Sequence, residues 1–435
     1  MPIYGIDLGT TNSLIGLHKT GFLSPIVPSC VNMETGEAGA AFFEDMNAKR
    51  SFKVDMSMGT EGITPRIASQ HVLEALKAQV TDDVVKEVVI SVPAYFTDGQ
   101  RTATLIAAEQ AGLDVKALVN EPTAAAMYIA HQKRGLYVVY DLGGGTFDCS
   151  IIDSRFDTFD VQATDGCKIG GDNFDANIMR YCIKNGSIRI QELTKQKRME
   201  LQHYCSKAKI YMQKNNKPFN LTLSKWSGKD IEFTPETYKS IMKMTFADTI
   251  NCLQKLMAAW VPSNEVCSIL LVGGSTHCPY LREWITEVTG RVPEELTYDP
   301  DRVVAQGAAL YADLVEKGEV NFMVSDVTKQ LGIGLYDGTV EIIVGANSKV
   351  PLSLQKMVTN KNDTDVLTLD LYQGNSIFTK DNELIGTLEY KYGRDVPAMS
   401  GQVIVQIDID SSGIIKLSAR ELLGEPRHII LRRKD

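Results

Sequence analysis

Two short segments of the sequence combine an aspartate, glycines and hydroxyl side chains in the same order. They are residues 7–13, Asp-Leu-Gly-Thr-Thr-Asn-Ser, and residues 141–148, Asp-Leu-Gly-Gly-Gly-Thr-Phe-Asp. Glycine turns without bulky side chains let backbone N–H groups approach phosphate oxygens closely. An aspartate at the start of each turn can hold a hard cation such as Mg²⁺ through its water ligands. The repeat therefore predicts a site for a phosphate chain and Mg²⁺ between two hairpin turns.

A third glycine turn follows another apolar run, in residues 270–276, Leu-Leu-Val-Gly-Gly-Ser-Thr. Any single turn of this kind is ordinarily just a turn, but three of them after strands predict a nucleotide cleft between two lobes. We expect this third turn to receive the adenosine side of the nucleotide. The sequence contains neither G-x-x-x-x-G-K-[ST] nor a strand-linked G-x-G-x-x-G, so neither a P-loop nor a dinucleotide fold explains these residues.

The elements that must position these turns divide the chain into two parts. Up to about residue 318, short apolar runs ending in glycine alternate with helical stretches such as 97–111 and 301–317, which is typical of an α/β domain. Beyond it, alternating runs at 341–344, 366–372, 401–410 and 414–419 predict a separate all-β module. We expect domains at 1–318 and 327–435, joined by a linker, 319–326, apolar enough to dock against a domain.

Composition restricts the functional class. The chain has 435 residues, 44% of them hydrophobic, and a net charge of -9, which argues against nucleic acid or an acidic membrane as the main partner. The first seven residues have neither a basic nor an apolar signal segment, and the eight cysteines are scattered without a C-x-x-C pair. These features predict a cytoplasmic protein with reduced thiols, and we expect a monomer.

Several segments, in the same order along the chain, resemble the signature segments of the DnaK-type seventy-kilodalton heat-shock chaperones. They are residues 6–13, 92–96 (Val-Pro-Ala-Tyr-Phe), 120–126 (Asn-Glu-Pro-Thr-Ala-Ala-Ala), 141–148 and 272–276, with 371–374 and 408–414 resembling the β-rich peptide-binding domain. The resemblance implies an α/β actin-like ATPase fold of two lobes followed by an all-β sandwich that binds peptides. It also implies hydrolysis of ATP to ADP with Mg²⁺.

The resemblance assigns roles to individual residues. Asp7 and Asp141 would bind the metal through water, Asp148 would support the attacking water, and Glu121 would couple the metal site to interdomain signalling. The phosphate and adenosine contacts would come from Gly9, Thr10, Thr11, Asn12, Gly143, Gly144, Gly145, Thr146, Lys209, Gly273, Gly274, Ser275, His277 and Asp301. Pro93 and Arg101 would relay the nucleotide state to the second domain.

The catalytic lysine of the family is matched less directly. Lys53 follows Phe52 as the family pattern requires, whereas counting back from Gly59 leads to Asp55. We choose Lys53, because only a cation can neutralise charge on a transferring phosphoryl group. The alternative is that Lys53 is a surface lysine.

The sequence departs from the family in several places. The stretches 16–88 and 174–269 are tens of residues shorter than in the family. Ser206, Gln213 and His277 replace charged or hydroxyl residues at the adenosine side, which predicts weaker ATP binding by about 1–3 kcal/mol. Ala117 stands where bacterial members have an arginine that contacts J-domains, so a J-domain partner and an exchange factor are left open.

The β module would supply the peptide pocket of the family. Spacing matches the pocket to Ile333, Tyr336, Met357, Leu367 and Leu369, although strand alternation alone also makes each of them a core residue. The sequence ends at Asp435, so we expect no helical lid and rapid peptide exchange.

Three functions are compatible with these features. The first is an ATP-driven chaperone that binds extended apolar segments of unfolded proteins. The second is a small-molecule kinase of the same fold, against which the linker and the β module argue. The third is a nucleotide-gated interaction protein or filament former without client-folding activity.

Overall fold

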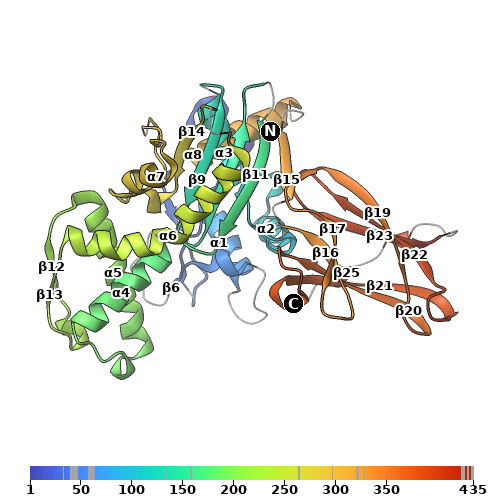
Figure 1. Ribbon diagram of the computed structural model, residues 1–435. Coiled ribbons are helices and arrows are strands. Elements are labelled where there is room, and N and C mark those ends of the chain that lie inside the picture. The colour runs from blue at the N-terminus through green and yellow to red at the C-terminus, as the bar shows by residue number, and fades with distance from the viewer. Residues whose placement is uncertain are drawn as a thin grey trace.

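The computed structural model describes residues 1–435 except 33, 40–47, 57–63, 132, 157–158, 263–264, 296, 320–322, 328, 423–426, 429–430 and 433–435. Figure 1 shows an α/β part on one side and an all-β module on the other. The predicted two-lobed α/β fold followed by a β-sandwich is confirmed. Three residues of the predicted linker, 320–322, lie outside the described residues.

The first lobe is built on a mixed sheet with the strand order β3-β2-β1-β7-β8, and β4 pairs with β2. The strands are β1 (Ile3–Leu8), β2 (Asn12–Leu17), β3 (Phe22–Leu23), β4 (Val27–Pro28), β7 (Glu87–Val92) and β8 (Asp114–Asn120). β1 and β2 are antiparallel, whereas β1, β7 and β8 are parallel. The hairpin between β1 and β2 therefore carries the first glycine turn at the edge where the parallel strands end.

Two helices, α1 (Pro65–Lys77) and α2 (Asp98–Gln110), share an apolar core with this sheet. Their starts follow from the sequence. Thr64 caps α1 directly before a proline, and Thr97 with Gln100 forms a capping box on α2. A small hairpin of β5 (Val31–Asn32) and β6 (Ala48–Lys49), the turn η1 (His18–Thr20) and the turn η3 (Phe52–Asp55) complete the lobe.

The second lobe contains a sheet with the order β14-β9-β10-β11-β15-β18. Its strands are β9 (Leu136–Leu142), β10 (Phe147–Asp153), β11 (Phe159–Cys167), β14 (Ser268–Val272), β15 (Met323–Val327) and β18 (Ser348–Val350). β9 and β10 are antiparallel, so the second glycine turn also lies at the tip of a hairpin. α6 (Pro235–Trp260) shares its core with β9 and β10, which include the fully buried Tyr140 and Phe147.

The two lobes meet where α3 (Glu121–Ala130) packs on α8 (Val303–Lys317). A Cβ atom at Gly307 of α8 would lie 1.8 Å from the Ala124 carbonyl oxygen of α3, so only glycine permits this close approach. α8 lies on the first sheet and α3 on the second. The two helices thereby fix the distance between the hairpin tips on either side of the cleft.

An outer helical region extends the second lobe over the cleft. It contains α4 (Gly171–Asn185), η4 (Ile190–Glu192), α5 (Lys195–Asn215), β12 (Phe219–Leu221), η5 (Ser224–Trp226) and β13 (Ile231–Phe233), whereas η6 (Gly274–His277) and α7 (Leu281–Thr289) follow β14 (Figure 1). Buried aromatic side chains such as Phe174 and Phe246 stack at 4.6 Å between ring centroids and join α4 to α6. This packing holds one face of α5 against the cleft.

The β module consists of two sheets around one core. One sheet has the order β17-β16-β20-β21-β25 and the other β19-β22-β23-β24. The strands are β16 (Leu331–Gly334), β17 (Val340–Val344), β19 (Leu352–Thr359), β20 (Thr364–Gln373), β21 (Glu383–Val396), β22 (Gln402–Ile409), β23 (Ile415–Glu421), β24 (Arg427–His428) and β25 (Leu431–Arg432), with the turn η8 (Thr379–Asp381) before β21. The four alternating runs of the sequence correspond to β17, β20, β22 and β23.

The segment predicted as a linker is not an isolated coil. Its last part forms β15, which pairs in parallel with β11 and antiparallel with β18. β15 therefore joins β11 of the second lobe to β18, a strand of the β module, in one sheet. These backbone hydrogen bonds are the contacts by which the segment docks. The exact domain boundaries stay a prediction.

The β module also contacts the start of α2. The Asp98 N–H donates to the Gln373 side-chain oxygen at 2.9 Å, and the Ile415 N–H donates to Asp98 Oδ1 at 2.8 Å. Arg101 donates to the Ser412 carbonyl oxygen at 3.1 Å. Buried hydrogen bonds of this kind are geometrically demanding, so they hold the two parts in one relative orientation.

Candidate functional site

The tips of the two repeated hairpins face each other. A Cβ atom at Gly144 would lie 2.1 Å from Thr11 Oγ1, and one at Gly9 would lie 2.0 Å from the Asn12 carbonyl oxygen. Side chains at these two glycines would collide with the opposite tip or with their own turn. The glycines therefore allow the backbones of both turns to line one narrow space.

The third glycine turn lies against the second hairpin. Gly273 has a φ of 84°, and a Cβ atom there would lie 2.5 Å from the Leu142 carbonyl oxygen. The Ser275 hydroxyl donates to the Gly143 carbonyl oxygen at 2.9 Å. The structure thus brings together all three turns that the sequence singled out.

The turns surround a cavity of about 950 Å³ between the lobes. Nearly all the predicted phosphate and adenosine residues line it, namely Gly9, Thr10, Thr11, Asn12, Gly143, Gly144, Thr146, Lys209, Gly273, Gly274, Ser275, His277 and Asp301. Gly145 lies in the same turn as Gly144 but is buried. The volume and the mixture of backbone, hydroxyl and charged groups suit a nucleotide-sized ligand.

Four carboxylates and one lysine gather at the phosphate end. Asp7 and Asp141 line the cavity together with Glu121, and Asp148 is buried behind them, in register with Asp141 across the β9–β10 hairpin. Burial is the main cause of raised pKa values at Asp7, Asp141 and Asp148, and repulsion from Glu121 adds to it at each. The pKa of Asp148 rises to about 7.

Hydrogen bonds fix two of these carboxylates. The Ser91 hydroxyl donates to Asp7 Oδ1 at 2.8 Å, and the Tyr95 backbone N–H donates to Asp148 Oδ1 at 2.8 Å. Sequence reasoning did not select Ser91 or Tyr95 as site residues. Tyr95 nevertheless belongs to the segment Val-Pro-Ala-Tyr-Phe, and its position just after β7 was the available signal.

Lys53 lies beside this acidic cluster. It is in η3, is only 2% exposed, and forms an ion pair with Glu121. Its ammonium also lies 5.6 Å from the centroid of the Phe96 ring. Asp55, the alternative position, is exposed. Lys53 is not itself among the residues that line the cavity, where the cations of the same segment are Lys49 and Arg50. Its burial and its ion pair with Glu121, which does line the cavity, favour Lys53 over Asp55, and its catalytic role stays a prediction.

The residues at the phosphate end fit a magnesium ion with water ligands. Asp141 Oδ2 is buried and has no hydrogen-bond partner among the described residues, so it is an acceptor that lacks a donor or a cation. Close, desolvated carboxylates repel each other, and a divalent cation relieves that repulsion. Asp7 and Asp141 are the side chains that would hold it, through water as hard Mg²⁺ prefers.

The adenosine end differs from the phosphate end. Lys209 of α5 forms a 2.8 Å ion pair with Asp175 and donates to the Gly171 carbonyl oxygen at 3.1 Å. Its charge is therefore already neutralised by α4. Ser206 and Gln213 lie on the same helix and line the cavity.

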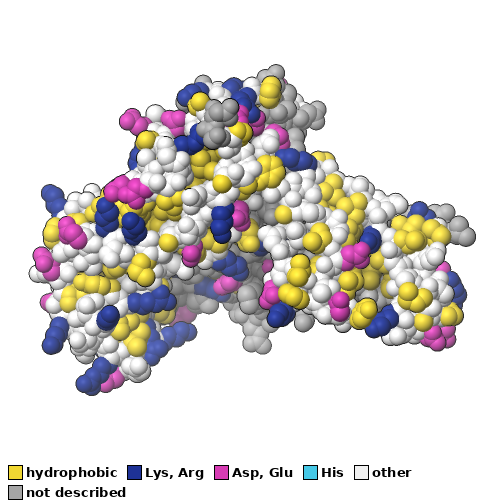
Figure 2. Space-filling view, in the orientation of Figure 1, with side chains coloured by type: hydrophobic (Ala, Val, Ile, Leu, Met, Phe, Trp, Pro, Cys, Tyr) yellow, Lys and Arg dark blue, Asp and Glu magenta, His cyan; other side chains and the backbone are white. Residues whose placement is uncertain are grey.

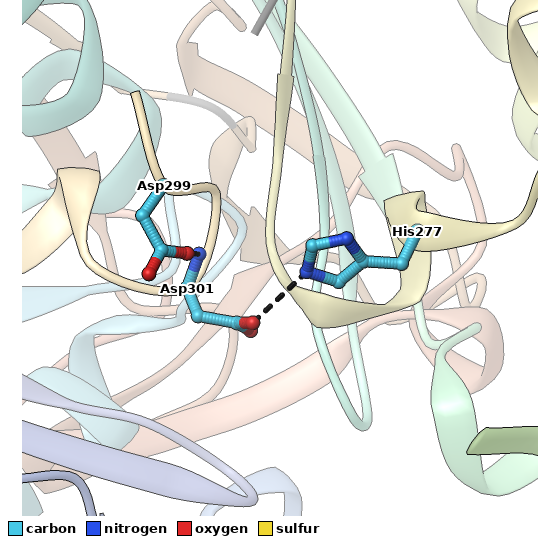
Figure 3. A group of neighbouring side chains, drawn as sticks. All are labelled: His277, Asp299 and Asp301. Atoms are coloured by element: carbon cyan, nitrogen blue, oxygen red, sulfur yellow. Dashed lines mark hydrogen bonds and ion pairs between the residues drawn. The ribbon is translucent and has the colours of Figure 1, made fainter. Parts of the chain in front are cut away.

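Figure 3 shows His277 pointing across this end of the cleft toward Asp301. The His277 Nε2 atom lies 3.0 Å from Asp301 Oδ2, and this hydrogen bond is the main cause of a raised pKa at His277. Asp299 carries a further carboxylate, and ligand atoms of all three residues lie within 4.8 Å of one another. Because His277 and Asp299 are exposed, this group alone does not establish a metal site.

The two predicted relay residues are both buried near α2. Arg101 donates to the Asn120 side-chain oxygen at 2.8 Å as well as to Ser412 of the β module. Pro93 follows β7 at the cleft side of the sheet. Arg101 thus connects the residue before Glu121 with the β module, and the relay itself stays a prediction.

The five predicted pocket residues separate into two groups. Ile333 and Leu367 are each 4% exposed and belong to the sandwich core, against which Leu369 packs. Tyr336 and Met357 are 85% and 57% exposed, and the Lys361 ammonium lies 4.0 Å from the centroid of the Tyr336 ring. Figure 2 shows further hydrophobic side chains on the surface of the β module, at the right of the view. Of the five, Tyr336 and Met357 are therefore the most accessible side chains, and their contact with a peptide stays a prediction.

A search of the helices in the described part of the chain yields none that is both long and apolar enough to cross a membrane.

Comparison with known proteins gives one consistent result. The family model described as Hsp70 protein matches residues 29–430. The chain is 32% identical over 473 residues to a chaperone protein HscA homolog of Pseudomonas aeruginosa strain LESB58, which covers 96% of this chain and 75% of that relative. It is 31% identical over 471 residues to a chaperone protein HscA homolog of Haemophilus influenzae strain PittGG, with the same coverage. The similarity includes both the cleft and the β module.

Proposed function

Because the chain belongs to the Hsp70 protein family, we propose that it binds extended apolar segments of unfolded proteins on its β module and couples this binding to ATP hydrolysis. Membership of the family makes the protein a chaperone and an ATPase. Beyond family membership, we propose the roles of the cleft residues, the position of the peptide site, and the coupling of peptide binding to ATP hydrolysis. The main support of the proposal is the cavity lined by the three glycine turns, Asp7, Asp141 and Glu121, with Lys53 paired to Glu121 beside it.

The proposed hydrolysis depends on placement and charge. Backbone N–H groups of the two hairpin turns and the hydroxyls of Thr10, Thr11 and Thr146 hold the phosphate chain. Mg²⁺, when bound, neutralises phosphate charge beside Asp7 and Asp141. Lys53 stabilises the negative charge that shifts during phosphoryl transfer, and Glu121 holds the Lys53 ammonium in place. Asp148, fixed by the Tyr95 N–H, lies behind the carboxylates as a support for the attacking water.

The proposed peptide site is on the β module. Exposed edges of strands offer backbone groups to an extended segment, and apolar side chains such as Tyr336 and Met357 provide contacts for its side chains. Coupling to the cleft would pass through α2, where Asp98 is hydrogen-bonded to Gln373 and to the Ile415 N–H. A J-domain protein and a nucleotide exchange factor are candidate partners, and a cytoplasmic location agrees with eight free cysteines.

The test is the rate of ATP hydrolysis with and without a short apolar peptide. A matched peptide with serine in place of its apolar residues is the control ligand. We expect the apolar peptide to raise the rate, and Gln373→Ala to lose most of this response because the hydrogen bond to Asp98 is lost. Gln355→Ala is the matched control, since Gln355 is exposed on β19 and donates to the Gln406 side-chain oxygen of the same module.

The outcome of this test distinguishes the proposed chaperone function from the two alternative functions. Hydrolysis without any peptide response would favour a nucleotide-gated interaction protein of the same fold. Turnover that requires a small hydroxylated or acidic acceptor would identify a kinase. If the purified chain does not hydrolyse ATP with Mg²⁺, the residue roles assigned to the cleft are wrong.

A further inference from the structure

Two buried serines lie behind the first glycine turn. Ser13 of β2 is completely buried, and Ser29, directly after β4, is 2% exposed. The Ser29 hydroxyl donates to the Gly9 carbonyl oxygen at 2.7 Å, and the Gly9 N–H donates to Ser13 Oγ at 3.1 Å. The two hydroxyl oxygens lie 2.9 Å apart. Both polar backbone groups of Gly9 are therefore bound by serine side chains.

The hydroxyl protons of the two serines can be placed from the chemistry of their partners. A hydroxyl has one proton and a carbonyl oxygen can only accept, so the proton of Ser29 is committed to Gly9. In the bond between the two serines, Ser13 must therefore donate to Ser29. The hydrogen bonds form a closed ring that runs from the Gly9 N–H through Ser13 and Ser29 back to the Gly9 carbonyl oxygen. Because each bond in such a chain polarises the next, removal of either hydroxyl weakens the whole ring.

The ring determines how the peptide groups of the turn are oriented. In a planar trans peptide, the carbonyl oxygen and the N–H that follows it point in opposite directions. Because Ser29 Oγ binds the Gly9 carbonyl oxygen, the N–H of Thr10 points away from Ser29. The Ser29 backbone N–H donates to the Thr11 carbonyl oxygen at 2.7 Å, which orients the N–H of Asn12 in the same way. Thr10, Thr11 and Asn12 all line the cavity.

We propose that Ser13 and Ser29 are positioning residues for the phosphate chain: their hydrogen-bonded ring holds the backbone N–H groups of the first turn in the orientation that phosphate oxygens require. The inference rests on the proposed ATPase function and adds to it the side chains that shape the first phosphate turn. Ser13 is not among the residues that line the cavity, so its effect on a ligand passes through Gly9. A turn held in this way needs no reordering when phosphates arrive, which strengthens their binding.

The alternative is that the ring only stabilises the first lobe. These two roles predict different effects on ligands with and without phosphates. General distortion of the lobe would weaken adenosine and ADP alike, because the whole cleft would change shape. Loss of positioning would weaken ADP alone, because adenosine would occupy the other end of the cleft, at the third glycine turn. The ratio of the two affinities is therefore the decisive quantity.

The experiment uses the full chain and measures two dissociation constants. The Kd of ADP with Mg²⁺ is measured by calorimetry, and the Kd of adenosine, the phosphate-free probe, by ligand-observed NMR titration. The variants are Ser13→Ala, Ser29→Ala and the double variant. Ser150→Ala is the matched control, because Ser150 of β10 is a buried serine whose Oγ lies 3.0 Å from Thr164 Oγ1 and which does not line the cavity. Circular dichroism reports whether each variant is folded.

We expect Ser13→Ala and Ser29→Ala each to raise the Kd of ADP about tenfold, within the range for a buried group that loses its hydrogen-bond partner, and to change the Kd of adenosine less than about twofold. The double variant should resemble either single variant, because one substitution already opens the ring and the two effects are coupled. Ser150→Ala should bind both ligands as wild type does.

The possible failures can be told apart. If wild type binds neither ligand, the proposed function fails. If wild type binds ADP but the serine variants keep its Kd, or adenosine weakens as much as ADP, or Ser150→Ala loses as much, the positioning role is refuted. Additive effects in the double variant contradict the ring. If one single variant does not fold, the other decides by the same ratio, and if neither folds, the serines maintain the lobe and the proposal is overturned.

Discussion

Lys53 and Glu121, which are 68 residues apart in the sequence, form an ion pair at the phosphate end of the cleft. The lysine comes from a turn of the first lobe and the glutamate from the start of α3, where the helix dipole favours a carboxylate. The side chain of Lys53 is almost completely shielded from solvent. Its charge is thus held in place before any substrate arrives, which is what electrostatic catalysis requires.

Replacement of Lys53 should affect the chemical step more than binding. We expect Lys53→Ala to lower the single-turnover rate of ATP hydrolysis about 100- to 1,000-fold, the usual effect of removing one preorganised charge-stabilising group. ATP affinity, measured by calorimetry, should change much less, because the lost charge matters most during transfer. Lys239→Ala is the control, since it removes a comparable but exposed Lys–Glu pair. Similar losses in both variants would contradict the assignment.

Loss of one metal-facing carboxylate should appear first in the magnesium dependence. Asp141→Asn keeps the shape of the side chain but removes the charge that would face the water ligands of Mg²⁺. We expect the Mg²⁺ concentration for half-maximal hydrolysis to rise more than tenfold, while circular dichroism stays unchanged. Glu121→Ala should also reduce hydrolysis severely, because Lys53 loses its partner. An Asp141→Asn protein with the wild-type magnesium curve would exclude this aspartate from the metal site.

The stability of the protein without nucleotide or metal should fall as the pH rises from about 4 to about 7. Burial and Glu121 raise the pKa of Asp148 to about 7, above the value of about 3.9 in an unfolded chain. Between these values the folded state binds the additional proton, so the free energy of unfolding decreases with pH. Asp7 shifts in the same direction for the same reasons. Chemical denaturation at several pH values should show a slope that Asp148→Asn reduces and that saturating Mg²⁺ with ADP counteracts.

The two groups of β-module residues should respond differently to substitution. Leu367→Ala should lower the free energy of unfolding by about 2–5 kcal/mol, because it removes buried methyl groups from the sandwich core. Met357→Glu and Tyr336→Glu should leave stability nearly unchanged and weaken binding of an apolar heptapeptide in fluorescence anisotropy. Met244→Glu, at a still more exposed methionine position on α6, is the control. Unchanged peptide affinity in both pocket variants would place the peptide site elsewhere.

The cleft could be predicted from the sequence because its chemistry is local. The first two glycine turns, with their flanking strands, are each encoded in one continuous segment, residues 3–17 and 136–153, and the third turn directly follows its strand, so Asp7, Asp141 and Gly273 could be identified without the fold. The position of the catalytic lysine, in contrast, could not be read from a local pattern. Counting from Gly59 led to Asp55, whereas the actual neighbour of Glu121 is fixed by the turn η3 and by packing of Phe52 in the core.

The contacts between the two parts could not be predicted in the same way. The hydrogen bonds of Asp98 join residues 275 and 317 positions apart, and no local pattern encodes such a pairing. The sequence was equally unable to predict which of Leu367 and Met357 is buried. Strand alternation predicts that one face of each strand is apolar, but it does not specify which side chains enter the core and which remain accessible.

The short strand β15 has a mechanical consequence. Among the described residues, it pairs with β11 through residues 323 and 324 and with β18 through residues 325–327. A tension that pulls the β module away from the α/β part is therefore carried by a few backbone hydrogen bonds along one strand, together with side-chain contacts at α2 and beside β11, such as the ion pair of Lys349 with Asp160. Because this ladder is short, we expect it to open before either neighbouring sheet unfolds when a polypeptide, bound as proposed, pulls on the β module.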